Sequence, residues 1–174
     1  MKRVMVVGGP GSGKSTLAVK LGKITGLPVF HMDLIHHLPG WVERPRADKL
    51  QLAHNIEESQ SWIFEGGLSA TFKNRASRAD TLIWLDLPLG IRLARILKRR
   101  VQYHNKPRPD VPENCPEHIS FEFTSYIIRT RNSHREKIAQ TIADAPHLKV
   151  HHIRTAKGAD TLLEWLTDEH QTHN

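Results

Sequence analysis

The chain has 174 residues, of which 39% are hydrophobic and 25% charged, with one cysteine and a net charge of +7. This length suits one compact domain that buries roughly 70% of the surface exposed by its unfolded chain. A single cysteine excludes a fold held by internal disulfides, and no apolar run approaches the roughly 20 residues that span a bilayer. The composition therefore predicts a soluble, cytoplasmic protein with no membrane partner.

Short apolar runs that end in glycine or proline alternate with helical patterns along the chain. The expected strands cover residues 4–7, 29–32, 62–64, 81–87 and 148–153. The expected helices cover residues 14–25 and 47–59, a basic segment to about 101, a long segment to about 143, and residues 159–166, and residues 34–46 are expected to be irregular. This alternation predicts one α/β domain over residues 1–174, with a mainly parallel five-stranded sheet and helices on both faces. Ligands of such sheets bind at the carboxyl ends of the strands, so the residues that follow each strand form the candidate site.

A glycine-rich loop joins the first expected strand to the first expected helix and matches G-x-x-x-x-G-K-[ST]. Its residues are Gly8, Gly9, Pro10, Gly11, Ser12, Gly13, Lys14, Ser15 and Thr16. Glycines let consecutive amide groups point at phosphate oxygens, and the helix N-terminus behind them adds partial positive charge. Lys14 reaches the β- and γ-phosphates of a bound nucleotide, and the Ser15 hydroxyl is a ligand for Mg²⁺. The complete motif in this context predicts ATP and Mg²⁺ as cofactors.

Basic side chains concentrate between residues 92 and 137, where few acidic residues oppose them. Arg92, Arg95 and Arg99 fall on one side of the expected basic helix. Arg131 and Arg135 lie one turn apart on the long helix that follows. A solvated helix face is the usual role of such residues, and contact with nucleotide phosphates is the alternative. The residues alone leave both interpretations open.

The phosphate loop, Asp33 and the segments 62–66 and 95–100 together resemble the adenylate-kinase-like superfamily of P-loop kinases. Nearly the whole chain, including the segments 39–42 and 108–110, is similar to small proteins called FlaR or "DNA topology modulation protein". The resemblance implies a three-layer P-loop NTPase fold with a lid. It also implies phosphoryl transfer from ATP to a small-molecule acceptor.

The resemblance further implies an acceptor-binding insertion at residues 34–60 and a lid at residues 101–120. Asp33 resembles an acidic residue that orients or deprotonates the acceptor hydroxyl, and capping of the segment after it is the alternative. The family usually has Asp-Gly-Asn-Tyr after the third strand, where this chain has Glu-Gly-Gly-Leu beginning at Glu65. Glu65 is expected either to hold a magnesium-bound water or to be a solvated carboxylate in a turn.

The arginines take their expected roles from the same resemblance. Arg95 and Arg99 resemble an adenylate kinase pair in which one arginine stacks on adenine and the next holds phosphate. Arg131 and Arg135 are expected to approach the phosphates from the side of the lid. Together with Lys14, Arg99 and Arg135 are the candidates for stabilising the transferring phosphoryl group, while Arg95 and Arg131 are expected to bind the nucleotide.

The remaining residues of interest receive structural interpretations. No histidine spacing matches a structural zinc site, and neighbouring histidines on a strand point to opposite faces, so surface or supporting positions are expected. Trp41 is expected to pack in the fold rather than to line the acceptor site. Cys115, between two prolines of the lid, is expected to have no specific role.

These observations favour an ATP-dependent kinase that acts on a small acceptor such as a nucleotide, nucleoside or similar metabolite. Two other classes stay open, namely a nucleotide-dependent DNA-associated protein and a nucleotide-binding regulator with little turnover. A DNA-binding protein carries its basic residues in a stripe along an outer face, whereas here they cluster where a lid would fold over nucleotide. DNA is therefore a possible but less favoured partner. The expected assembly is a monomer or homodimer.

Overall fold

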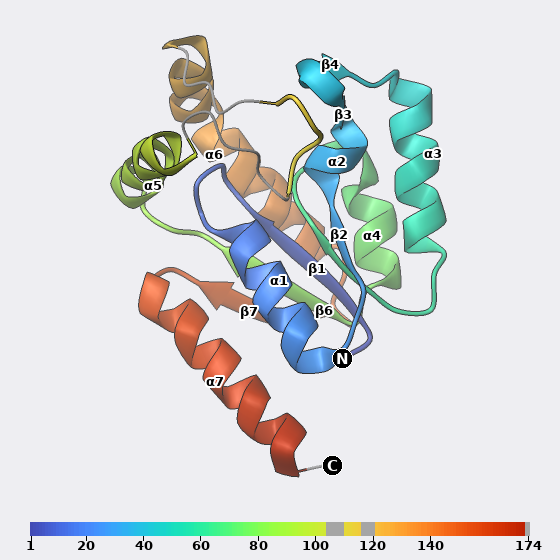
Figure 1. The fold of residues 1–174 in the computed structure, drawn as a ribbon. Coiled ribbons are helices and arrows are strands. Elements are labelled where there is room, and N and C mark those ends of the chain that lie inside the picture. The colour runs from blue at the N-terminus through green and yellow to red at the C-terminus, as the bar shows by residue number, and fades with distance from the viewer. Residues whose placement is uncertain (104–109, 116–120, 173–174) are drawn as a thin grey trace.

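The computed structural model describes residues 1–103, 110–115 and 121–172 (Figure 1). Its main sheet has five strands in the order β2-β5-β1-β6-β7, and every neighbouring pair is parallel. The strands are β1 (Arg3–Gly8), β2 (Val29–His31), β5 (Trp62–Glu65), β6 (Thr81–Leu85) and β7 (Lys149–Ile153). The predicted α/β fold class with a mainly parallel five-stranded sheet is confirmed.

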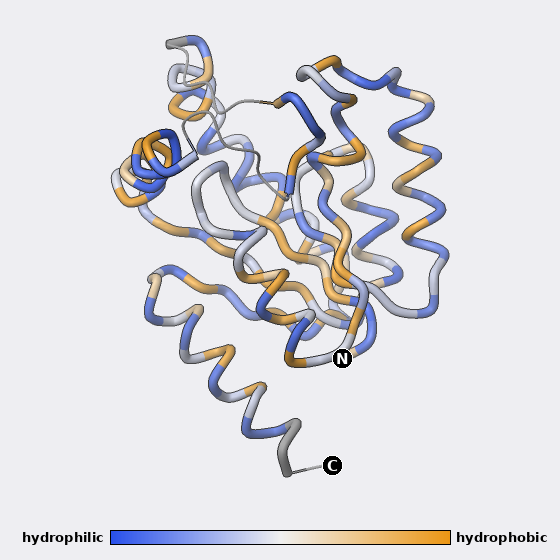
Figure 2. The backbone as a smooth tube through the Cα atoms, viewed as in Figure 1, coloured by the Kyte–Doolittle hydropathy of each residue, from blue (hydrophilic) through white to orange (hydrophobic). Residues whose placement is uncertain are grey.

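Alternate residues of the strands point into two separate hydrophobic cores, because side chains alternate between the faces of a sheet. On one face, Val4 and Val6 pack with α1 (Lys14–Thr25) and α7 (Ala156–Thr172). On the other face, Met5 and Val7 pack with α2 (Met32–His36), α3 (Arg46–Glu57), α4 (Phe72–Arg78) and α6 (Phe121–Ala143). Figure 2 shows the hydrophobic residues concentrated along these strands. Helices therefore cover both faces, and the three layers expected for the fold are present.

The segment expected to be irregular is in fact ordered. It contains α2, an antiparallel pair of two-residue strands, β3 (His37–Leu38) and β4 (Val42–Glu43), and a 3₁₀ turn, η1 (Pro39–Trp41), between them. The prolines that suggested an irregular segment lie at the first position of η1 and directly before α3, which are positions where helices tolerate proline. A second 3₁₀ turn, η2 (Ser69–Thr71), and the short helix α4 were not predicted.

Several expected boundaries also shift, two of them with a clear local cause. The fourth strand ends at Leu85 instead of residue 87, because Pro88 already precedes the basic helix α5 (Leu89–Gln102). The last helix begins three residues earlier than expected, at Ala156, where the Thr155 hydroxyl accepts a hydrogen bond from the Gly158 amide. No helix in the described part of the chain is both long and apolar enough to cross a membrane.

Part of the expected lid contacts the β3–β4 hairpin. Of residues 101–120, the stretches 104–109 and 116–120 lie outside the described residues. In the described stretch, the Glu113 carbonyl accepts a hydrogen bond from Gly40, and the Cys115 sulfur accepts one from the Trp41 amide at 3.2 Å. Cys115 is buried and packs against the hairpin backbone, and the expectation that it has no specific role stays a prediction.

Candidate functional site

The carboxyl ends of the strands open into a cleft of about 1220 Å³. The cleft is lined by the phosphate loop, by the residues that follow β2, β5 and β6, and by one side each of α5 and α6. Every site residue expected from the sequence lines this cleft: residues 8–16 of the loop, Asp33, Glu65, Arg95, Arg99, Arg131 and Arg135. These residues were selected because ligands of parallel sheets bind at the strand ends, and in the structure they line the same cleft. Their individual roles stay predictions.

The backbone of the phosphate loop is held from behind by α5. Gly11 adopts a φ of +77°, and a Cβ atom there would lie 2.4 Å from the Arg92 carbonyl oxygen, so only glycine fits. The Arg92 Nε donates to the Pro10 carbonyl at 2.9 Å, and Arg95 donates to the Ser12 carbonyl at 3.0 Å. Arg92 is buried, so its interpretation as part of a solvated face is wrong. Both arginines therefore fix carbonyl groups of the loop.

Glu65 is neither exposed nor solvated. It is 2% exposed at the end of β5, and one of its oxygens lies 2.7 Å from Nδ1 of His31 at the end of the neighbouring strand β2. Burial lowers the pKa of His31, but the hydrogen bond and charge of Glu65, with Asp110 and Asp33, outweigh it and raise that pKa above its ordinary value of 6.5. The interpretation of Glu65 as a solvated turn carboxylate is therefore wrong.

This pair predicts a pH-dependent stability. The pKa of His31 is raised in the folded state, so protonated His31 stabilises the fold fully below pH 6.5. This stabilisation is lost as the pH rises through the pKa that His31 has in the folded protein. We expect the free energy of unfolding of the wild type to fall more steeply than that of His31→Gln between about pH 6 and pH 8. Urea denaturation across this range measures both slopes. Parallel slopes for the two proteins would contradict the assignment of this pH dependence to His31.

Asp86, which sequence reasoning did not single out, helps to build the site. Asp86 follows β6 and accepts hydrogen bonds from Arg135 at 2.9 Å and from His152 at 3.1 Å, while the His152 ring stacks on Trp84 at 4.1 Å. The sequence prediction places Asp86 inside a strand of residues 81–87, so the strand-end rule marks Asp86 only once the strand is seen to end at Leu85. Arg135 is thus tied to the end of β6, beside the phosphate loop, in this structure.

Arg75 of α4 is fully buried beneath the site. Its guanidinium carbon lies 4.6 Å from the Phe64 ring centre and 5.3 Å from that of Phe72, and it donates to the Gly66 carbonyl at 3.1 Å. Burial lowers its pKa to about 10, although Glu57 and Glu65 act in the opposite direction. Arg75 therefore anchors the turn after β5 from below.

His134 of α6 also lines the cleft. Its ring meets Phe72 edge to face, and a Cβ atom on Gly67 would lie 3.4 Å from its Nε2. Burial lowers its pKa, and the charges of Lys14, Arg92 and Lys137 lower it further. His134 is therefore a neutral imidazole at neutral pH.

One end of the cleft is lined by residues of α2 and the hairpin segment. Asp33 lies in the first turn of α2, whose N-cap is His31, and its exposed side chain lines the cleft. Asp33 is therefore not the N-cap that was its alternative interpretation. Trp41 also lines the cleft and is 38% exposed, so the expectation that it packs in the fold is wrong. In the described ranges, no three His, Cys, Asp or Glu side chains converge to hold a metal ion.

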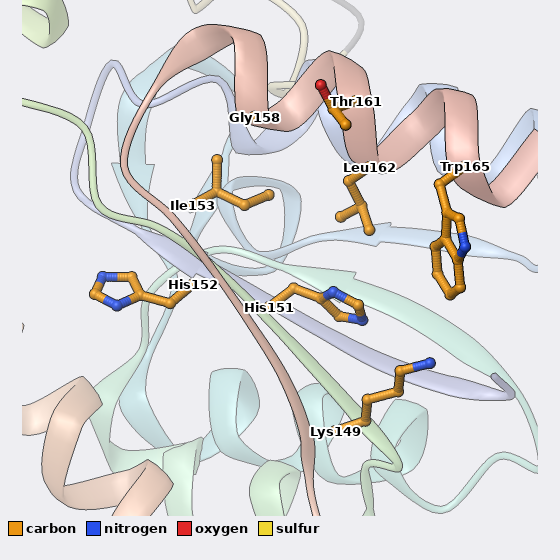
Figure 3. Close-up of a pocket in the computed structure, with 8 residues that line it drawn as sticks. All are labelled: Lys149, His151, His152, Ile153, Gly158, Thr161, Leu162 and Trp165. Carbon is orange, nitrogen blue, oxygen red and sulfur yellow. The ribbon is translucent and has the colours of Figure 1, made fainter.

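A second, smaller pocket of about 460 Å³ lies between β7 and α7 (Figure 3). His151 and Trp165 face this pocket, whereas the His152 side chain extends to the opposite side, as expected for neighbours on a strand. Lys149 lies 4.8 Å from the centre of the Trp165 ring. This pocket contains no residue of the phosphate loop and is separate from the cleft.

Comparison with known proteins places the chain in a family. Residues 4–114 match the family model described as an AAA domain. The chain belongs to this family. Among curated proteins, YqaC of Bacillus subtilis, itself described as uncharacterized, is 30% identical over 108 residues, which cover 58% of this chain and 58% of that relative. The AAA domain match includes the phosphate loop, α2, the hairpin and α5.

Solved structures with the same fold include kinases of small molecules. Shikimate kinase from Acinetobacter baumannii, in complex with shikimate, aligns with a TM-score of 0.66 at 13% identity and covers 100% of this chain and 96% of that one. Shikimate kinase from Bacteroides thetaiotaomicron aligns with a TM-score of 0.56 at 15% identity, covering 97% of each chain. A sugar kinase from Janibacter aligns with a TM-score of 0.51 at 14% identity, covering 99% and 93%. At these identities the likeness shows a shared P-loop kinase fold.

Proposed function

We propose that this protein transfers the γ-phosphoryl group of ATP to a hydroxyl group of a small molecule. The observation that carries the proposal is that the phosphate loop after β1 and the Asp33 carboxylate after β2 line one cleft, although β5 lies between these two strands in the sheet. Kinases that act on small molecules share the fold, and shikimate kinase and a sugar kinase are among them. The insertion at residues 34–60 and the lid at residues 101–120 belong to this proposal, the former as the acceptor-binding part.

The nucleotide half of the cleft supplies positive charge. Lys14 binds the β- and γ-phosphates, the loop amides bind phosphate oxygens, and Arg99 and Arg131 lie along the same cleft. Mg²⁺ neutralises phosphate charge when it is bound. The Ser15 hydroxyl would hold it directly and the Glu65 carboxylate through a water, an all-oxygen set that suits Mg²⁺.

Asp33 acts on the acceptor. Its carboxylate accepts the proton of the acceptor hydroxyl as that oxygen forms a bond to the γ-phosphorus. The bond between the γ-phosphorus and the bridging oxygen breaks, and ADP leaves with the electron pair. His134 and Gly67 line the same cleft.

We place the protein with the FlaR-like group of the adenylate-kinase-like superfamily, on the likeness of nearly the whole chain. The name of that group raises DNA binding as a second function. Arg92 and Arg95, however, hold the carbonyls of the phosphate loop, and the basic residues of α5 line a cleft. This arrangement favours a small nucleotide over a duplex. A cytoplasmic location and a monomeric or homodimeric state remain part of the proposal.

The test of the function is a screen for ADP formation. Wild type with ATP and Mg²⁺ is mixed with nucleosides, nucleotides, sugars and small hydroxy acids in turn, and we expect one class to stimulate ADP release. Salt-dependent binding to duplex DNA is measured on the same protein. Steep salt dependence with no stimulating compound would replace the kinase proposal by the DNA-associated one.

We also expect Lys14→Ala to remove most of the stabilisation that ATP with Mg²⁺ gives to the fold. A ligand at about 100 times its dissociation constant adds roughly 2.7 kcal/mol to the free energy of unfolding. Thermal unfolding with and without nucleotide measures the effect. The control is Lys23→Ala, because Lys23 is exposed at the other end of α1. Equal stabilisation of Lys14→Ala and the control would contradict nucleotide binding at the loop.

A further inference from the structure

The Asp86 carboxylate holds the Arg135 side chain beside the first residues of the phosphate loop. Leu85, the last residue of β6, is paired with Gly8 of β1, and Asp86 follows directly after this pair. The Oδ2 atom of Asp86 accepts a hydrogen bond from Nη2 of Arg135 at 2.9 Å. Both side chains line the cleft. An arginine of α6 is therefore fixed to the end of the strand next to the loop.

The ammonium group of Lys14 lies in the same part of the cleft. Its Nζ atom is 3.4 Å from the Gly9 carbonyl oxygen, at the start of the loop. The charge of Lys14 also acts on His134, the residue before Arg135, and contributes to its lowered pKa. In a P-loop kinase this lysine reaches the β- and γ-phosphates of the nucleotide. Arg135 is therefore held near the place where those phosphates bind.

The Asp86 carboxylate is itself fixed by two strands. Its side chain is 8% exposed, and its Oδ2 atom also accepts a hydrogen bond from Nε2 of His152 at 3.1 Å. The His152 ring stacks on Trp84, with the ring centres 4.1 Å apart and the planes 7° from parallel. The Asp86 amide donates to the Ile153 carbonyl at 2.8 Å. Asp86 therefore has a defined orientation before any ligand binds.

Arg135 keeps donors for a second partner. Asp86 engages one of the three guanidinium nitrogens, and the Arg135 side chain is 52% exposed. A guanidinium carries five N–H donors in a fixed fork, so one end can hold a carboxylate while the other meets phosphate. An arginine already held at one nitrogen loses less side-chain freedom when phosphate binds.

We infer that Asp86 is a positioning residue, which holds the Arg135 guanidinium where it meets the γ-phosphate of a bound nucleoside triphosphate. His152, stacked on Trp84, fixes the Asp86 carboxylate in turn. The inference rests on the proposed phosphoryl transfer, in which Arg135 stabilises the transferring group, and it adds the residues that set this arginine in place.

The experiment compares the affinity for the β,γ-imido analogue of ATP with the affinity for ADP, both measured by calorimetry with Mg²⁺. The ratio of these affinities reports contact with the γ-phosphate and needs no acceptor. We expect Arg135→Gln to lower the ratio by roughly 10-fold to 100-fold, the usual worth of a hydrogen bond to a charged group. Asp86→Asn is expected to lower it by about 3-fold to 10-fold, because an amide holds a guanidinium more weakly than a carboxylate does.

The double variant of Asp86→Asn with Arg135→Gln decides whether Asp86 acts through Arg135. We expect its ratio to equal that of Arg135→Gln alone, because the carboxylate has nothing left to position. His152→Phe keeps a ring on Trp84 but removes the donor, and it is expected to lower the ratio in the same direction. The control is Asp144→Asn, because Asp144 is an exposed carboxylate directly after α6 and does not line the cleft.

Each outcome decides one question. A lowered ratio in both single variants, with no further loss in the double variant and none in the control, supports the inference. An unchanged ratio in either single variant, or additive losses in the double variant, overturns it. If Asp86→Asn does not fold, His152→Phe combined with Arg135→Gln provides the same comparison, since His152 is 39% exposed. A coupled loss without any acceptor that stimulates ADP formation supports the positioning of Arg135 and overturns the proposed phosphoryl transfer.

Discussion

Replacing Asp33 by asparagine is expected to lower acceptor-stimulated ADP formation by roughly 10²–10⁴-fold, the usual contribution of a general base. The affinity for ATP is expected to stay nearly unchanged, because Asp33 lies on α2 and the phosphate loop follows β1. Asparagine has the same size and keeps a hydrogen-bonding oxygen, but it cannot take a proton at neutral pH. Folding should therefore survive, since Asp33 is an exposed residue of a short helix.

The measurement separates turnover from nucleotide binding. ADP formation is followed with the stimulating acceptor, and ATP affinity is measured by calorimetry on the same preparations. Asp48→Asn serves as the control, because Asp48 is an exposed residue near the start of α3 and does not line the cleft. Full turnover of Asp33→Asn would remove this residue from the catalytic machinery. A proportional loss of ATP affinity would show that Asp33 acts on nucleotide binding.

The phosphate loop and the sheet were predictable because they depend on local sequence. The loop requires glycine at residues such as Gly11, where the backbone is left-handed and the Arg92 carbonyl approaches closely. The strands β1, β5 and β6 are short apolar runs buried on both faces, and this pattern needs no knowledge of the partner strand. Such features can be recognised from a few consecutive residues, and the residues after the strands then follow from topology.

The partners of the site residues were not predictable, because they come from distant parts of the chain. In the sequence Glu65 directly precedes two glycines, as a solvated turn residue would. Only the parallel pairing of β2 with β5 places it against His31. Trp41 lies in the cleft because the stretch that includes Cys115 returns to the hairpin, 74 residues later in the chain. Side-chain exposure and ion pairing therefore required the tertiary structure.

The helix α4 was still harder to predict from the local sequence. It has seven residues and follows a 3₁₀ turn, so its sequence carries little helical periodicity. Its position depends instead on Arg75, whose guanidinium is enclosed by Phe64 and Phe72 and bound to the Gly66 carbonyl. Gly66 itself has a φ of +109°, and a Cβ atom there would lie 2.5 Å from the Met32 Cβ. Core packing, the turn after β5 and the start of α2 therefore depend on one another.

Arg75→Ala is accordingly expected to lower the free energy of unfolding by on the order of 3–5 kcal/mol, the usual cost of removing one partner from a buried charged group. The substitution leaves a cavity between two aromatic rings and takes the buried cation away from Glu57 and Glu65. The matched control is Arg78→Ala on the same helix, because Arg78 is partly exposed and its ion pair with Glu58 is worth about 1 kcal/mol or less. Urea denaturation of the three proteins gives the comparison. Arg75→Met, which fills the space without the charge, should recover part of the lost stability, although the Gly66 carbonyl still lacks its donor. Equal losses for Arg75→Ala and Arg78→Ala would show that the buried guanidinium does not hold the turn.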